Sequence, residues 1–199
     1  MKLADLHFYR GDLAQALDTV RSALRKVKED RRLYLCGRHN LGFYLTEAGE
    51  FWEAAEQLAA DEPLYGEFPD PWTQLRLLWL RARIAAGLGQ SEQAEAFFLS
   101  ARDGFIAQGI GYDAAMVSLE LALLFLREGR TADVKRLAEE LLPIFEAQDV
   151  HREAAAALVL FQDAARREEL TVKVVRELAK YLRDARADPS LRFRGDQPS

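Results

Sequence analysis

The chain has 199 residues, of which 49% are hydrophobic and 30% are charged, and its formal net charge is −5. These proportions are typical of an ordinary folded protein. Basic residues are interspersed with acidic ones instead of gathering in one segment, which argues against nucleic acid as a partner. The most apolar segments are too short to span a bilayer, and no signal peptide is recognisable. We therefore expect a soluble, cytoplasmic protein that has no membrane partner.

Taken in chain order, the sequence predicts pairs of helices joined by short turns. Four glycines, Gly11, Gly49, Gly89 and Gly129, are spaced 38, 40 and 40 residues apart, and each follows an apolar, helix-forming run. A repeat of this length is typical of stacked helical hairpins. The helix pairs are expected at residues 1–10 and 12–29, 31–48 and 50–61, 71–88 and 91–108, 111–128 and 131–148, and 151–168 and 171–187.

Together these pairs predict a single domain over residues 1–187, followed by a flexible tail at 188–199. Its units are expected at about 1–30, 31–61, 71–108, 111–148 and 151–187. Asp70 and Pro71 are expected to begin a helix as N-cap and first helical residue. The stretch DEPLYGEFPDP at 61–71 predicts a long connection after a short helix. The fifth unit has no turn glycine, which favours a terminal cap.

The residues at fixed offsets within each unit resemble those of the tetratricopeptide repeat. That family places a Leu-Gly pair, an aromatic residue, a turn glycine, an alanine and a second aromatic residue at fixed offsets. In the second unit Leu41-Gly42, Leu45, Gly49, Ala54 and Leu58 stand at these offsets. The resemblance implies an all-α fold, a right-handed α-solenoid of about five stacked antiparallel helix pairs. The period near 40 exceeds the usual length of about 34 residues. It is similar to the longer-helix relatives found in bacterial regulators and signalling proteins.

No motif in the sequence points to catalysis or to a metal. The nucleophile-elbow, phosphate-loop and zinc-protease patterns are absent. His39 follows Cys36 by three residues, so the two side chains could offer two ligands on one helical face. Structural zinc needs four ligands, and the sequence has no second pair. We expect no enzymatic activity, no cofactor and no bound metal, and the single cysteine excludes an intrachain disulfide.

A protein or peptide is the expected partner. The resemblance implies that the first helix of each pair lines the concave face of the stack, where the partner would bind. The residues expected on this face are His39, Asn40, Phe43, Glu47, Arg76, Trp79, Arg83, Leu119, Leu123 and Arg127. Trp and Arg are enriched at binding hot spots. The alternative is that Phe43 and Trp79 pack between adjacent units. The family's clamp of Lys, Asn and Arg for a peptide C-terminus is not matched.

A second candidate surface is the segment from Pro63 to Trp72, which is rich in aromatic residues. Exposed apolar side chains there would mark an interface. The alternative, which we favour, is that the segment folds over its own repeat as a plug.

Three functions are consistent with these patterns. The first is a non-catalytic scaffold, which predicts an open concave face with Phe43, Trp79 and Arg83 exposed. The second is a sensor or dimerisation segment of a larger bacterial regulatory protein, which predicts apolar patches on the first or fifth unit and a homodimer. The third is an accessory domain of an enzyme whose chemistry lies on another segment.

Overall fold

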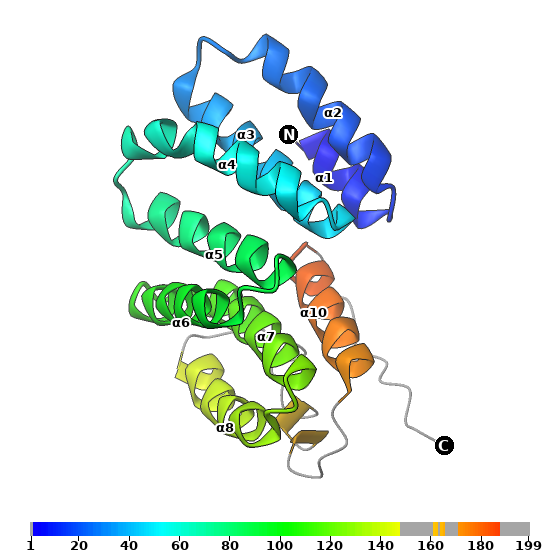
Figure 1. Ribbon diagram of the computed structural model, residues 1–199, viewed down its shortest axis with the longest axis vertical. Coiled ribbons are helices and arrows are strands. Elements are labelled where there is room, and N and C mark those ends of the chain that lie inside the picture. The colour runs from blue at the N-terminus through cyan, green and yellow to red at the C-terminus, as the bar shows by residue number, and fades with distance from the viewer. Residues whose placement is uncertain (1, 148–160, 163, 166–170, 188–199) are drawn as a thin grey trace. The chain divides into compact units, whose positions relative to one another are not determined.

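A computed structural model describes residues 2–147, 161–162, 164–165 and 171–187. All regular structure in these ranges is α-helical, which confirms the predicted all-α fold (Figure 1). The helices are α1 (Lys2–Tyr9), α2 (Leu13–Lys26), α3 (Arg31–Ala48), α4 (Phe51–Gly66), α5 (Pro71–Gly87), α6 (Ser91–Ala107), α7 (Gly111–Arg127), α8 (Thr131–Ala147) and α10 (Val172–Ala187).

The chain divides into two compact units, residues 1–97 and residues 98–199, and the boundary falls inside α6. The repeat pattern predicts one domain over residues 1–187, whereas the packing groups the helices in two sets. In unit 1 each helix from α1 to α4 packs against its successor, and α3 also contacts α5. In unit 2 α7 packs against both α8 and α10.

The turn glycines end the first helix of each pair, as predicted. Gly49 follows α3 with φ of 80°, a left-handed conformation that residues with a Cβ rarely adopt. Its N–H donates to the carbonyl of Thr46, and the N–H of Glu50 donates to that of Leu45. This pattern satisfies carbonyl groups that the end of a helix leaves unpaired. The other three glycines of the ladder also have positive φ.

Aspartates begin three helices of unit 1. The side chains of Asp12, Asp30 and Asp70 each accept a hydrogen bond from the backbone N–H three residues later. These bonds satisfy donors that have no partner within the helix. The predicted start of α5 at Pro71 is confirmed.

The connection predicted at residues 61–71 is shorter than expected, because α4 continues to Gly66 with Pro63 inside the helix. Proline removes one helical hydrogen bond. Packing compensates for this loss, since Leu64 and Tyr65 are buried in the core and Asp61 pairs with Arg38 of α3. The prediction that the helix ends at residue 61 was therefore wrong. The aromatic segment packs into unit 1, as the plug interpretation expects.

Small residues allow close packing in unit 1. Gly42 of α3 faces α5, and a Cβ built there would lie 3.0 Å from Cδ2 of Leu80. The ring of Phe51 covers Gly87 so closely that any side chain there would collide with it. The fully buried Tyr44 and Leu45 fill the space beside these contacts.

In unit 2, α10 packs on α7 through one apolar stripe. Val175, Leu178 and Leu182 are spaced at intervals of three and four residues, and each is at most 1% exposed. This spacing places them on one face of the helix. Most of the helix predicted at 151–168 and the tail at 188–199 lie outside the described residues.

Candidate functional site

Two rows of half-buried residues run along α3 and α5 of unit 1. We call this surface the α3–α5 face and define it as Arg32, Cys36, Asn40, Phe43 and Glu47 of α3 with Trp72, Arg76, Trp79 and Arg83 of α5. Within each row the residues are three or four positions apart, so they lie on one side of their helix. All but the exposed Arg32 have intermediate exposure.

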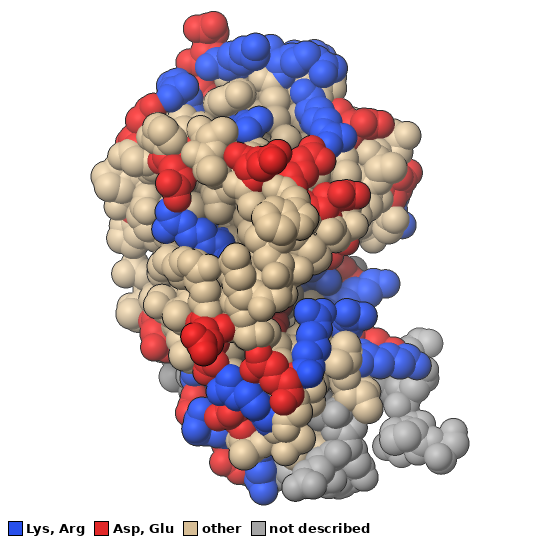
Figure 2. Space-filling model, viewed as in Figure 1, with Lys and Arg blue, Asp and Glu red and all other residues tan. Residues whose placement is uncertain are grey.

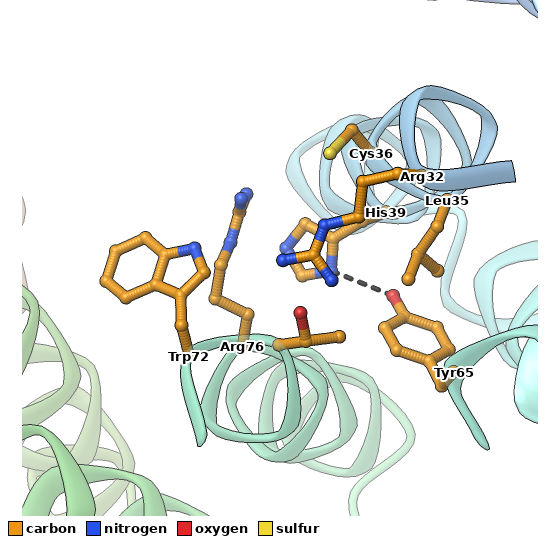
Figure 3. A pocket seen from close by; sticks show the side chains of 8 residues that line it. Arg32, Leu35, Cys36, His39, Tyr65, Trp72 and Arg76 are labelled. Carbon is orange, nitrogen blue, oxygen red and sulfur yellow. Dashed lines mark hydrogen bonds between the residues drawn. The ribbon is translucent and has the colours of Figure 1, made fainter. Parts of the chain in front are cut away.

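A pocket opens at the end of the face that contains the N-termini of α3 and α5 (Figure 3). It encloses about 310 Å³ of empty space, part of it open to solvent. Its lining residues are Arg32, Leu35, Cys36, His39, Tyr65, Trp72, Thr73 and Arg76. Two of these residues carry a positive charge and none is an aspartate or glutamate. The pocket therefore combines cations with an aromatic and aliphatic wall.

Neighbouring side chains hold Arg32 in position. Its guanidinium donates a 2.7 Å hydrogen bond to Asp70, and it lies 4.9 Å from the centre of the Phe68 ring. The hydrogen bond from Arg32 lowers the pKa of Asp70 to about 2, and bonds from Thr73 contribute to this shift. Asp70 is thus ionised at neutral pH. Since Arg has five N–H donors, this pair leaves Arg32 further donors.

His39 lies buried at the base of the pocket. Its Nδ1 is 2.8 Å from the hydroxyl of Tyr65. Burial lowers the pKa of His39 well below its usual value, and the charges of Arg76 and Arg83 lower it further. Burial raises the pKa of Tyr65, so its hydroxyl keeps its proton. Both rings are therefore neutral at pH 7.

The tautomer of His39 depends on which of the two groups donates in this pair. When the Tyr65 hydroxyl donates to Nδ1, the proton of the neutral imidazole is on Nε2. Figure 3 shows this second ring nitrogen directed away from Tyr65 and towards Arg76. His39 then presents an N–H donor, and not a charge, to the pocket. Thr73 uses its own hydroxyl proton to donate to Asp70.

The other end of the α3–α5 face is closed by its own side chains. The guanidinium of Arg83 forms an ion pair with Glu47 and lies 4.4 Å from the centre of the Phe43 ring. Phe43 also contacts the ring of Phe8 edge-on, with the centroids 5.3 Å apart. The side chain of Arg83 is only 12% exposed.

The expectation that Phe43, Trp79 and Arg83 are exposed was therefore wrong, because all three are half-buried. The physical reason for Phe43 and Arg83 is the pairing of Arg83 with Glu47 over the Phe43 ring. These residues therefore pack within unit 1 and also lie on the α3–α5 face.

The predicted residues of α7 belong to unit 2. Leu119 is fully buried in unit 2, so it offers no surface to a partner, and Leu123 is half-buried. Arg127 is exposed at the end of α7. Of the predicted set, the structure brings together His39, Asn40, Phe43, Glu47, Arg76, Trp79 and Arg83 on or under the α3–α5 face.

The sequence prediction missed Arg32, Leu35 and Thr73 as lining residues, and it placed Tyr65 and Trp72 in a different surface. Helical spacing carried the signal for two of them. Arg32 stands four residues before Cys36, and Trp72 stands four residues before Arg76. Tyr65 had no such signal, because its position depends on the unexpected last turn of α4.

Charges of both signs cover the face of the molecule shown in Figure 2, with acidic residues and basic residues close together. Within the described part of the chain, no group of three or more His, Cys, Asp or Glu side chains is placed to hold a metal ion. No described helix is long and apolar enough to cross a membrane.

No protein-family model matches the chain, and searches of curated proteins and of solved structures returned no match either. The resemblance to tetratricopeptide repeats therefore stays a prediction that rests on the residues quoted above. The function has to be argued from the geometry of the α3–α5 face alone.

Proposed function

We propose that this protein is a non-catalytic interaction module that binds a protein or peptide partner through the α3–α5 face. One observation carries the proposal: two helical rows present aromatic and guanidinium groups together, and they are partly open to solvent. Trp and Arg contribute most to the binding energy where an interface is fully desolvated. Half-buried side chains also lose less conformational freedom on binding than fully exposed ones.

The open end of the face is the better anchor for a partner. The lining of the pocket places two guanidiniums beside the indole of Trp72, and Arg32, which pairs with Asp70, has further N–H donors. A partner that carries an acidic and an apolar side chain complements this end. The central contacts are therefore expected at Trp72 and Arg76, with Asn40 and Trp79 beside them.

Site-specific photo-crosslinking in cells that express the protein tests this proposal. A benzophenone amino acid at Asn40 or Trp79 should give a discrete adduct with one partner. The matched control is Trp52 of α4, which is 75% exposed but lies outside the face. Adducts of equal yield at Trp52, or no adduct at either face position, would contradict the proposal.

Charge reversal on α5 provides a second test. Arg76→Glu should abolish the adduct at Asn40, since it removes a cation from the face. Arg81→Glu is the matched control, because Arg81 pairs with Glu62 outside the pocket lining. If both variants lose the adduct equally, the effect is not specific to the face.

A second candidate function, self-association of a regulatory segment, is favoured by α1. Leu3, Leu6 and Tyr9 follow one another at three-residue intervals and are 57%, 43% and 48% exposed. Apolar side chains gathered in this way mark interaction surfaces. Light scattering over a range of concentrations should then show a dimer that Leu6→Glu disrupts. A monomer at every concentration would rule this function out.

A further inference from the structure

Helix α1 of unit 1 is apolar on two sides, and only one of them is packed. On the inner side Ala4 is fully buried and the ring of Phe8 contacts aromatic rings of α3. On the outer side Leu3, Leu6 and Tyr9 are 57%, 43% and 48% exposed. A helix that is apolar around most of its circumference is typical of one that lies between two neighbours. The outer side of α1 therefore has the character of a contact surface.

The repeat shows what kind of element covers such a surface. The turn glycines that follow α1 and α3 are 38 residues apart, so Leu3 and Leu6 correspond to Leu41 and Tyr44. These two residues of α3 are only 6% and 1% exposed. Helix α2 packs against α3, and the hydroxyl of Tyr44 donates a hydrogen bond to α1. In the second pair these positions are thus covered by the helices of the first. A helix is therefore the element expected over the equivalent positions of α1.

Two cations frame the apolar side chains. Lys2 and Arg10 are exposed, and neither forms an ion pair with another described residue. The backbone of Arg10 still follows the helix, since its N–H donates to the carbonyl of Leu6. With 3.6 residues per turn, the five exposed side chains lie within a sector of about 120°. We call them the α1 row: Lys2, Leu3, Leu6, Tyr9 and Arg10.

Two aspartates close to the row are bonded to other groups. Asp5 accepts a 2.6 Å hydrogen bond from Tyr44 on the inner side of α1, and Asp12 accepts one from the backbone N–H of Gln15. Their charges lower the total charge of the region. The two cations of the row therefore select a partner by their positions, and each is expected to contribute modestly to affinity.

The positions of these cations also separate two kinds of occupant. Two copies of α1 packed antiparallel about a two-fold axis would bring Lys2 of one copy close to Arg10 of the other. Like charges oppose that arrangement. A helix with carboxylates beside its apolar stripe can instead pair with both cations.

We propose that the α1 row binds an amphipathic helix of a partner protein whose apolar stripe is flanked by carboxylates. The site goes beyond the binding proposed for the α3–α5 face and does not depend on it. It is an alternative to self-association through α1, because both would use the same side chains. The row offers three apolar side chains, so the isolated interaction is expected to be weak.

The test uses a capped, fluorescein-labelled peptide of about 18 residues, which is long enough to form a helix. It has leucines three and four positions apart, glutamates beside them and alanines elsewhere. One control peptide has lysines in place of the glutamates, and a second has the same composition with the leucines spread around the helix. Fluorescence anisotropy should show saturable binding of the acidic peptide. The lysine peptide should bind at least about fivefold more weakly, and the scrambled peptide should not bind.

Exposed leucines provide the matched comparison for the apolar contact. Leu6→Gln should weaken binding of the acidic peptide by about tenfold, because it removes an apolar side chain from the contact. Leu33→Gln on α3 changes a leucine that is 39% exposed outside the row, and binding should stay within about twofold. Circular dichroism checks that both variants fold. If Leu6→Gln unfolds, Leu3→Gln provides the same test.

Charge reversal tests the two cations. The double variant Lys2→Glu with Arg10→Glu should weaken binding of the acidic peptide by about fivefold and strengthen binding of the lysine peptide. Lys180→Glu, at an exposed position of α10 in unit 2, is the control and should leave both affinities within about twofold.

Saturable binding of the acidic peptide that both Leu6→Gln and the double reversal weaken supports the proposal. Binding that is lost in Arg76→Glu but kept in Leu6→Gln would place the peptide on the α3–α5 face and overturn it. A dimer in light scattering that Leu6→Gln disrupts would assign the row to a second copy of the chain, and this would overturn it too. Equal binding of the two charged peptides, or no binding, has the same consequence. None of these outcomes decides the crosslinking test at Asn40, so the two proposals can fail separately.

Discussion

Helices α5 and α7 hold equivalent positions in the 40-residue repeat, yet one has a partly open face and the other is almost entirely buried. The residues of α5 on the α3–α5 face are Trp72, Arg76, Trp79 and Arg83, and forty positions later stand Tyr112, Met116, Leu119 and Leu123. Arg76 and Arg83, the two arginines of α5 on this face, thus correspond to the apolar Met116 and Leu123 of α7. In unit 2 the amphipathic helix α10 packs on α7, whereas α5 keeps a face that is partly accessible.

This comparison teaches that the repeat specifies the helices but not what covers them. The same register can present a binding surface or a core face, and the choice depends on whether guanidiniums or methyl-bearing side chains occupy it. Arg keeps its charged head in water while its stem packs on apolar surface. Met116 and Leu119 have no such requirement, and they are 5% and 0% exposed.

Exchanging equivalent residues of α5 and α7 should have the largest effect on stability. Met116→Arg places a charge in the core of unit 2 and is expected to lower the free energy of unfolding by about 3–5 kcal/mol, as for an uncompensated buried charge. The reciprocal change Arg76→Met should alter it by less than about 1 kcal/mol, because Arg76 lies at a half-buried surface. Urea unfolding followed by circular dichroism measures both. Similar losses in the two variants would contradict the assignment.

Weakening the cover of α7 should have the next largest effect. Leu182→Ala removes a fully buried side chain from the α10 stripe and should cost about 2–5 kcal/mol. Lys180→Ala, on the exposed side of the same helix, should stay within about 0.5 kcal/mol. Differential scanning calorimetry compares the two variants. Equal unfolding temperatures would mean that α10 is not part of the core of unit 2.

Breaking the closed end of the α3–α5 face should have a smaller effect. Glu47→Gln removes the carboxylate that pairs with the guanidinium of Arg83, whose side chain is only 12% exposed. The free energy of unfolding is expected to fall by about 1.5–3 kcal/mol. The control Glu67→Gln breaks the pair of Glu67 with Arg31, whose side chains are 43% and 54% exposed, and should have a clearly smaller effect because solvent screens this pair. A lower urea midpoint for Glu67→Gln than for Glu47→Gln would show that the ion pair does not close this end of the face.

The smallest expected effect is a dependence of stability on pH through His39. Its pKa is held below 6.5 in the folded protein by burial and by Arg76 and Arg83, so the unfolded chain binds the proton more readily. The free energy of unfolding should therefore fall as the pH drops through about 6.5, by at most about 1.4 kcal/mol per unit. His39→Gln should remove this component of the slope between pH 7.5 and pH 5.5. An unchanged slope would show that His39 is not buried as a neutral ring.

The sequence predicted the helices and their turns well, because their signals are local. The turn glycines require a left-handed backbone, and Asp70 with Pro71 begins a helix through contacts within four residues. The last turn of α4 could not be predicted in this way. Pro63 is tolerated there because Leu64 and Tyr65 are buried by other parts of unit 1, which only the tertiary structure determines.

The candidate site was predicted only in part, because some of its contacts depend on the tertiary structure. Helical spacing correctly grouped His39 with Asn40 and Phe43, and Arg76 with Trp79 and Arg83. It did not reveal that Arg83 folds onto Phe43, or that Tyr65 approaches His39 from α4. These contacts join residues 26 to 40 positions apart, and one sequence gives no direct signal for such pairs.

The central claim is that the α3–α5 face binds a protein or peptide partner, and the only cysteine of the chain lies within this face. Cys36 lines the pocket and is partly exposed, so the rate at which iodoacetamide modifies it measures access to the pocket. The partner captured by crosslinking at Asn40 should slow this modification by about tenfold, and it should give no protection to the variant Arg76→Glu. An alkylation rate that the partner leaves unchanged would contradict the account.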